Sequence, residues 1–159
     1  MQNNDSLLVV AALLGAAAYI LSEESASAGS AGSSGVNGFA INNPGNIRYN
    51  AANQWQGQTG SQNGFCVFDT LADGVRAMGI LLTNYYQSGL QTITQIISKY
   101  APASENDTDA YILDVSNRTG DSADEPLQWP DDEVSLIQAI VWHEQGNNPM
   151  SDADVQGYI

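Results

Sequence analysis

Residues 64–78, GFCVFDTLADGVRAM, change from the pattern of a strand to the pattern of a helix. Residues 65–68 are apolar and of β-favouring types, and the Asn and Gly before them are typical of a turn. Thr70 then stands where a helix N-cap is expected, with an acidic residue three positions later. The stretch therefore predicts a strand that leads into a helix over residues 71–88, which Gly89 ends.

The residues before this stretch are rich in turn formers and aromatic side chains. Residues 42–46, NNPGN, predict a turn. Residues 47–49 and 54–56 have the composition of short strands, separated by Asn and Gly. Together with residues 65–68, they predict a small antiparallel sheet.

The residues after it carry helical patterns. Residues 92–100 place apolar side chains at i, i+3, i+4 and i+7. Asp107 or Thr108 is expected to cap a helix that runs to residue 119, and Pro130 precedes another at residues 131–145. Residues 151–158 add a final turn or two. The chain thus predicts an α+β domain, mainly α-helical with a small antiparallel sheet.

The N-terminal part has a different composition. Residues 7–21 are apolar and uncharged, but fewer than the roughly 20 that span a bilayer. They fit an uncleaved membrane anchor, a secretory signal or a helix buried in an assembly, and the lack of Lys and Arg there weighs against a signal. We expect a single hydrophobic helix or signal in residues 1–24, a flexible Ser/Gly/Ala linker in residues 25–38 and the globular domain in residues 39–159.

The charge balance bears on possible partners. Four basic residues face eighteen acidic ones, which gives a formal net charge of -14. Such a chain has no basic patch to neutralise phosphates, so nucleic acid is not an expected partner.

Metal and thiol chemistry have little support. Cys66 is the only cysteine and His143 the only histidine. The apolar neighbours of Cys66 predict a packed, inert thiol. The acidic residues around Asp107 do not form a calcium loop, because Ala110 stands where an EF-hand needs glycine. We expect no metal and no cofactor.

Glu144 is the strongest candidate for chemistry. It lies in the stretch AIVWHEQGNNP, residues 139–149, near the end of the last long predicted helix, and Gly146 follows that end. The carbonyl dipoles of a last turn disfavour a carboxylate, and nearby Ile140 and Trp142 lower the local polarity. A carboxylic acid held neutral in this way can protonate a glycosidic oxygen. The alternative is a solvated end residue, paired with water or an arginine.

Aromatic and amide side chains are frequent throughout the predicted domain. Aromatic rings stack on sugars and amides bond to sugar hydroxyls, although the same aromatics also suit a small core. The candidates are Tyr49, Trp55, Tyr85, Tyr86, Trp129 and Trp142, with Asn43, Asn46, Asn53, Gln54 and Gln56.

Several of these motifs together resemble a known family. NNPGNIR at residues 42–48, WQG at residues 55–57, GFCVFDT at residues 64–70 and HEQG at residues 143–146 resemble bacteriophage virion proteins of the "NPGNIR" type, described as structural or as cell-wall lytic. A weaker similarity runs to lysozyme-like and glucosaminidase domains that cleave peptidoglycan. In those domains the helix with the catalytic Glu precedes the Asn-Asn segment, whereas here Glu144 follows it.

The resemblance implies a lysozyme-like domain and, as one function, a virion-associated muramidase or lytic transglycosylase. Glu144 would be its general acid, and Glu105 or Asp69 a second carboxylate. Asn46 and Arg48 would orient the glycan strands of peptidoglycan, and the rings of Tyr49 and Trp55 would stack on the sugars. The enzyme would be tethered to a membrane through residues 7–21 and would act in the host periplasm or envelope.

The other implied function is structural. The chain would be a non-enzymatic phage protein, anchored in a viral membrane or bound to other virion proteins. In that case Arg48 and Glu144 would clamp the domain by pairing with each other, which would leave Glu144 ionised.

Overall fold

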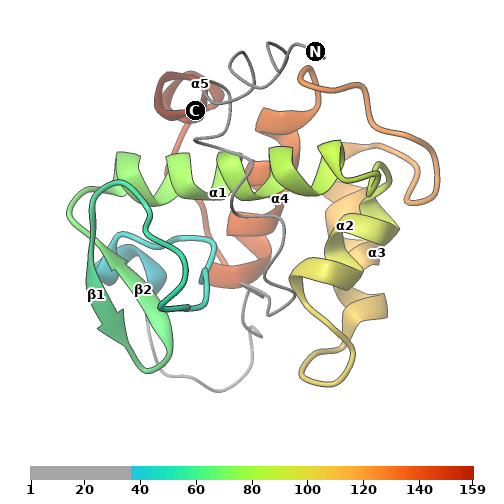
Figure 1. Ribbon diagram of the computed structural model, residues 1–159. Coiled ribbons are helices and arrows are strands. Elements are labelled where there is room, and N and C mark those ends of the chain that lie inside the picture. Colours follow the sequence, from blue (N-terminus) through green and yellow to red (C-terminus); the bar gives the residue numbers. More distant parts are fainter. Residues whose placement is uncertain (1–36) are drawn as a thin grey trace, which may run out of the picture.

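The computed structural model describes residues 37–159, so the predicted N-terminal helix and nearly all of the linker lie outside the described residues (Figure 1). The described part is a mixed α+β fold, as predicted, with a two-stranded sheet and five α-helices. Its elements are the 3₁₀ helix η2 (Gly38–Ile41), β1 (Gln58–Gln62), β2 (Phe65–Phe68), α1 (Leu71–Gln87), α2 (Ile93–Tyr100), α3 (Thr108–Thr119), α4 (Glu133–Gln145) and α5 (Asp152–Tyr158). Within residues 37–159, no helix has the length and apolar character needed to cross a membrane.

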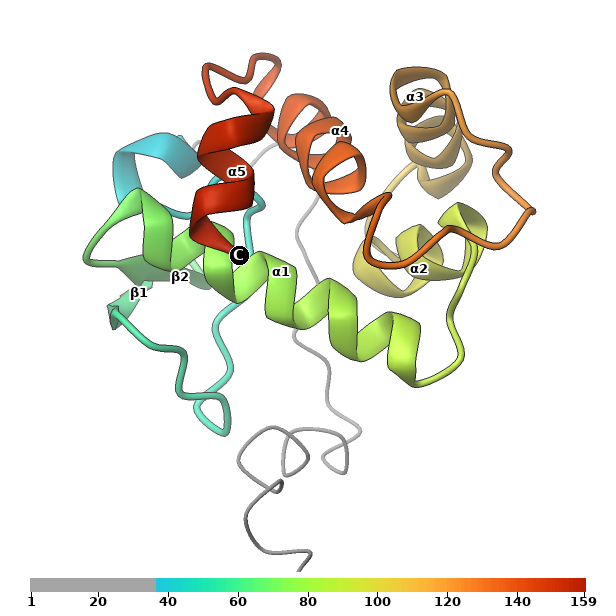
Figure 2. The same cartoon turned by 90° about the horizontal axis from the view of Figure 1, so that it is seen from above.

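Helix α1 runs through the middle of the described fold and contacts β2, α2, α4 and α5 (Figures 1 and 2). The sheet lies at one end of α1, and α2 and α3 lie towards the other. The Thr70 hydroxyl accepts a hydrogen bond from the backbone N–H of Asp73, as the sequence predicted for the cap. Val75, Met78 and Leu82, which recur at helical spacing, are fully buried.

The other helices largely follow their predicted limits, because their caps are local. Thr92 caps α2 in a capping box, and Asp107 caps α3. Helix α4 begins at Glu133, two residues later than predicted. The Asp132 carboxylate bonds to the backbone N–H of Gln128 instead of capping α4, so a turn precedes the helix.

The sheet is smaller than predicted on its N-terminal side. Strand β2 was predicted, and it pairs antiparallel with β1. Residues 47–49 form only an isolated bridge, from Arg48 to Phe65. Residues 54–56 are not a strand, because a turn through Gly57 (φ 72) follows Trp55, whose ring packs in the core. The local sequence pattern could not show that the Trp55 ring packs in the core, because that contact is tertiary.

The predicted turn at residues 42–46 is present, and it packs closely on α1. Asn43 is buried; its amide donates to the carbonyls of Ile47 and Cys66 and accepts from the N–H of Ile47. Gly74 lets α1 approach this turn, since a Cβ there would lie 1.8 Å from the Asn42 carbonyl oxygen. The turn is therefore held between the sheet and α1.

Candidate acid site at Glu144

Glu144 lies in the last turn of α4, where its side chain is buried. The residue is 8% exposed. Its Oε1 accepts a hydrogen bond of 2.8 Å from the Tyr111 hydroxyl, and its Oε2 accepts one of 2.9 Å from the Asn46 side-chain amide. The alternative of a solvated end residue is therefore wrong.

The environment raises the pKa of the Glu144 carboxyl group to near neutral pH. Burial raises the pKa of Glu144 from 4.5 to about 7. The hydrogen bonds from Tyr111 and Asn46, and the charge of Arg48, lower the pKa but do not cancel the effect of burial. Near pH 7 a large fraction of the carboxyl groups is protonated, as the sequence-based hypothesis required.

Asn46 is held in place by the residue that follows Glu144. Asn46 has a left-handed backbone, with φ 50, and is 3% exposed. The Gln145 amide donates to the carbonyl of Pro44 at 2.9 Å and to the Asn46 side-chain oxygen at 3.3 Å. The Gln145 side-chain oxygen accepts from the N–H of Gly38. The end of α4 thus fixes the turn that supplies the Asn46 donor.

Tyr111, on α3, is held by a second set of contacts. It is 1% exposed, and its ring stacks on His143 with centroids 3.6 Å apart. His143 Nδ1 lies 2.9 Å from Asp114, which also accepts from Arg118. Sequence reasoning did not select Tyr111 or Gln145. The helical phase of α3, fixed by the Asp107 cap, was the signal that could have placed Tyr111 inward.

Arg48 and Glu105 form an ion pair beside this site. The Arg48 Nη2 lies 2.5 Å from Glu105 Oε2, and the two side chains are 33% and 45% exposed. The guanidinium also lies over the Phe65 ring, 5.4 Å from its centroid. The predicted Arg48–Glu144 clamp is therefore wrong: Arg48 pairs with Glu105 and acts on Glu144 only through its charge.

The remaining predicted site residues have different surroundings. Tyr49 follows Arg48 and is 43% exposed. Trp55 is 9% exposed and belongs to the hydrophobic core, which was the alternative considered for the aromatics. Asp69 is exposed and precedes α1, where its carbonyl accepts from the Asn42 amide. The structure thus brings together Glu144, Asn46, Arg48 and Glu105.

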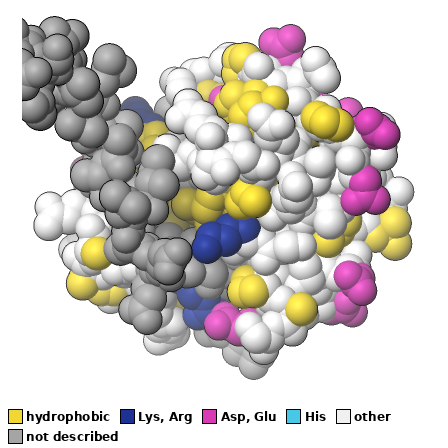
Figure 3. All heavy atoms as spheres, turned by 45° about the vertical axis from the view of Figure 1, so that its right-hand side comes forward, with side chains coloured by type: hydrophobic (Ala, Val, Ile, Leu, Met, Phe, Trp, Pro, Cys, Tyr) yellow, Lys and Arg dark blue, Asp and Glu magenta, His cyan; other side chains and the backbone are white. Residues whose placement is uncertain are grey.

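Neither Cys66 nor the acidic side chains form a metal site in the described residues, and on the face drawn in Figure 3 the acidic side chains are spread mainly along one side. Cys66 is fully buried, as predicted, and burial raises the pKa of its thiol to about 11. Across residues 37–159, no group of three or more His, Cys, Asp or Glu side chains could hold a metal ion.

Fold and site together define a small α+β domain with a buried acid whose pKa is raised. No family model matches the sequence. The chain is 34% identical over 126 residues to Protein P5 of Pseudoalteromonas phage PM2, a match that covers 75% of this chain and 77% of that protein. The chain therefore belongs to the family of this phage protein, and the phage part of the sequence-based resemblance is confirmed.

Proposed function

We propose that this chain is a virion protein that cleaves peptidoglycan as a lytic transglycosylase of lysozyme-like fold, with Glu144 as its general acid. The observation that carries the proposal is the position of Glu144, buried in the last turn of α4 between two hydrogen-bond donors, where burial raises its pKa to about 7. General acids work best when their pKa lies near the working pH. The relationship to a phage protein supports the viral context.

The proposed reaction needs one acid. Glu144 protonates the glycosidic oxygen, and the bond from the anomeric carbon to that oxygen breaks. A hydroxyl of the same sugar then bonds to the anomeric carbon and returns its proton to the Glu144 carboxylate. Tyr111 and Asn46 donate to that carboxylate while it is ionised. No cofactor takes part.

The surroundings of Glu105 favour this one-acid reaction over hydrolysis with two carboxylates. Glu105 is exposed and is held by its ion pair with Arg48, and among the described residues no hydrogen bond joins it to Glu144. In the proposal, Glu105 positions Arg48, and Arg48 and Asn46 orient the glycan. The exposed ring of Tyr49 stacks on the glycan, whereas the ring of Trp55 packs in the hydrophobic core.

The direct test uses isolated peptidoglycan and the purified full chain. The wild type is expected to release muropeptides whose terminal sugar is ring-closed, identified by mass spectrometry. Glu144→Gln should lower this release by about 100-fold or more while keeping the fold. Glu133→Gln, which alters another buried acid of the same helix, is the matched control and should keep the activity. A folded wild type that releases nothing between pH 5 and pH 8 would refute the proposal.

The location forms a separate part of the proposal. We place the protein in the virion, attached to a membrane through residues 7–21 and in contact with other virion proteins, and acting in the host periplasm or envelope. Purified particles should contain the chain, and detergent should release it from them. Deletion of residues 1–24 should abolish its retention. Retention that survives both detergent and the deletion would contradict the membrane attachment.

A structural role is the second candidate, and one observation favours it. Glu144 is only 8% exposed and both its oxygens are already hydrogen-bonded, so the network joins α3, α4 and the turn at residues 42–46. On this alternative, particles carrying Glu144→Gln would assemble and infect normally. Loss of infection from correctly assembled particles would favour the enzyme.

A further inference from the structure

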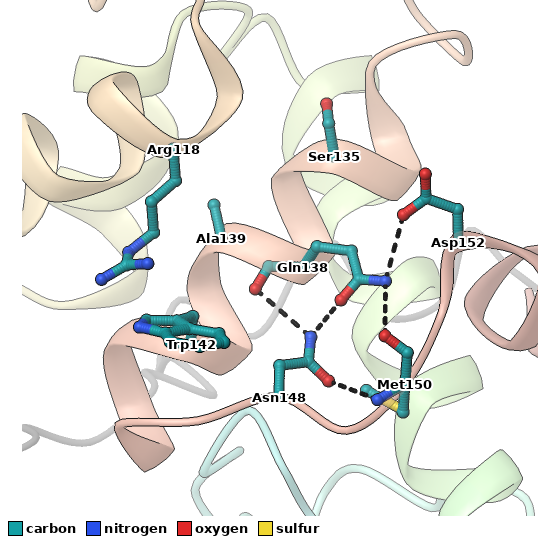
Figure 4. Close-up of a pocket in the computed structure, with 8 residues that line it drawn as sticks. All are labelled: Arg118, Ser135, Gln138, Ala139, Trp142, Asn148, Met150 and Asp152. Atoms are coloured by element: carbon teal, nitrogen blue, oxygen red, sulfur yellow. Dashed lines mark hydrogen bonds between the residues drawn. The ribbon is translucent and has the colours of Figure 1, made fainter.

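A second candidate site lies on a different face of α4 (Figure 4). It is a pocket of about 570 Å³, within the size range of small-ligand sites. Its lining residues are Arg118, Ser135, Gln138, Ala139, Trp142, Asn148, Met150 and Asp152. The α4 members recur at i, i+3, i+4 and i+7, which defines one stripe of the helix. Glu144 is not on this stripe.

One wall of the pocket is fixed by hydrogen bonds among its own side chains. The Asn148 amide donates to the Gln138 side-chain oxygen, and its oxygen accepts from the N–H of Met150 at 3.0 Å. The Gln138 amide donates to the Met150 carbonyl at 3.1 Å and to Asp152 Oδ1 at 3.2 Å (Figure 4). These bonds hold Asp152 at the rim through one carboxylate oxygen, which leaves the other oxygen able to accept.

Arg118 forms another wall, and most of its donors remain available. Its Nε donates to both oxygens of Asp114, at 3.0 Å each. Within residues 37–159, its two terminal nitrogens make no hydrogen bond. The guanidinium lies 4.9 Å from the centroid of the Trp142 ring, and Trp142 is 39% exposed. A planar fork of this kind matches a carboxylate bidentately.

We propose that this pocket binds a short peptide bearing both a free carboxylate and a free ammonium group. The Arg118 fork takes the carboxylate, the Asp152 oxygen takes the ammonium, and Trp142 packs on the apolar part between them. The charges favour such a ligand, because a zwitterion has no net charge to be repelled by a chain of net charge -14. The ligand is thus a short peptide with both ends free, and this inference stands independently of the proposed function.

The test is a calorimetric titration of the full chain carrying Glu144→Gln, so that cleavage does not interfere. The probe is trialanine, compared with its N-acetylated and C-amidated forms. Free trialanine should bind about tenfold more tightly than either blocked form. Arg118→Gln should remove the preference for a free carboxylate alone, and Asp152→Asn the preference for a free ammonium alone. Arg76→Gln changes an arginine that pairs with Asp73 outside the pocket, and should have no effect.

Equal binding of the free and blocked peptides would overturn the inference. Failure of the proposed function looks different: trialanine binds with the stated preferences while the wild type releases nothing from peptidoglycan. Release without peptide preference would refute this inference alone.

Discussion

The two ends of α4 each carry a buried acid, and their surroundings differ. Glu133, in the first turn, is 9% exposed and accepts from the Thr83 hydroxyl at 3.1 Å. Glu144, in the last turn, is 8% exposed and accepts from two donors. Burial raises the pKa of both carboxyl groups. The helix dipole favours a carboxylate only at the Glu133 end.

This difference shows that burial alone does not distinguish the two acids. The hydrogen-bond donor to Glu133 comes from α1, which packs beside it. Glu144 receives its donors from α3 and from the turn at residues 42–46, and the charge of Arg48 reaches it as well. Polar groups from two distant segments, α3 and residues 46–48, converge on Glu144, which is the arrangement expected of a site.

The largest expected effect is on the pH dependence of stability. Below pH 4.5, Glu144 is protonated in both the folded and the unfolded chain. Between pH 4.5 and about 7 the unfolded chain loses this proton first, so the wild type loses folding stability as the pH rises. Above that range the loss reaches about 3 kcal/mol. Relative to the wild type, Glu144→Gln should therefore gain about 3 kcal/mol between pH 4 and pH 8.

Urea unfolding at several pH values measures this gain. Glu133→Gln is the control, and it should shift in the same direction by less, because the first turn of a helix favours the carboxylate. Equal gains for the two variants would remove the distinction between the two ends of α4.

The next effect concerns two glycines of α1: Gly74 packs on the turn at residues 42–46, and Gly79 lies near Glu133. At Gly74, an added Cβ would lie 1.8 Å from the Asn42 backbone oxygen, so the turn that supports Asn46 must move. At Gly79, the Cβ would lie 2.8 Å from the Ile159 side chain, and a side chain can shift more easily than backbone. We expect Gly74→Ala to lower the free energy of unfolding by about 2 kcal/mol and Gly79→Ala to lower it by about half of that or less. The helix propensity of alanine offsets part of the clash at both positions, so the difference comes from what each Cβ meets. Thermal unfolding would show the order, and a larger cost at Gly79 would contradict this account.

The parts that the sequence predicted correctly are those with local causes. The caps at Thr70 and Asp107 act within three residues, and the apolar spacing of α1 sets its buried face. The hydrogen bond from Asn46 to Glu144 joins residues 98 positions apart, and no local pattern specifies it. Glu144 could be selected as a candidate because its place in the helix is local. Its partner Tyr111 and the pairing of Arg48 with Glu105 depend on how α3 and the loops pack.

A smaller effect is expected from Tyr111→Phe, which removes one donor to Glu144. That hydrogen bond lowers the pKa of Glu144, so its loss should raise the pKa further and cost about 1 kcal/mol of stability at neutral pH. Tyr100→Phe is the control, because its hydroxyl donates to the Gly45 carbonyl and not to Glu144. Carboxyl titration by NMR would follow both variants. An unchanged pKa in Tyr111→Phe would show that this bond does not act on Glu144.

The smallest expected effect is at Glu105, the carboxylate that was predicted from the sequence as a second catalytic group. Its ion pair with Arg48 is partly exposed, so Glu105→Gln should cost about 0.5 kcal/mol or less. If one acid suffices, muropeptide release should fall by less than about tenfold, and the products should remain ring-closed. A loss as large as that of Glu144→Gln, with products that have gained water, would instead make Glu105 a true second carboxylate. The comparison between an exposed, ion-paired glutamate and a buried one with a raised pKa therefore decides between a transglycosylase and a hydrolase.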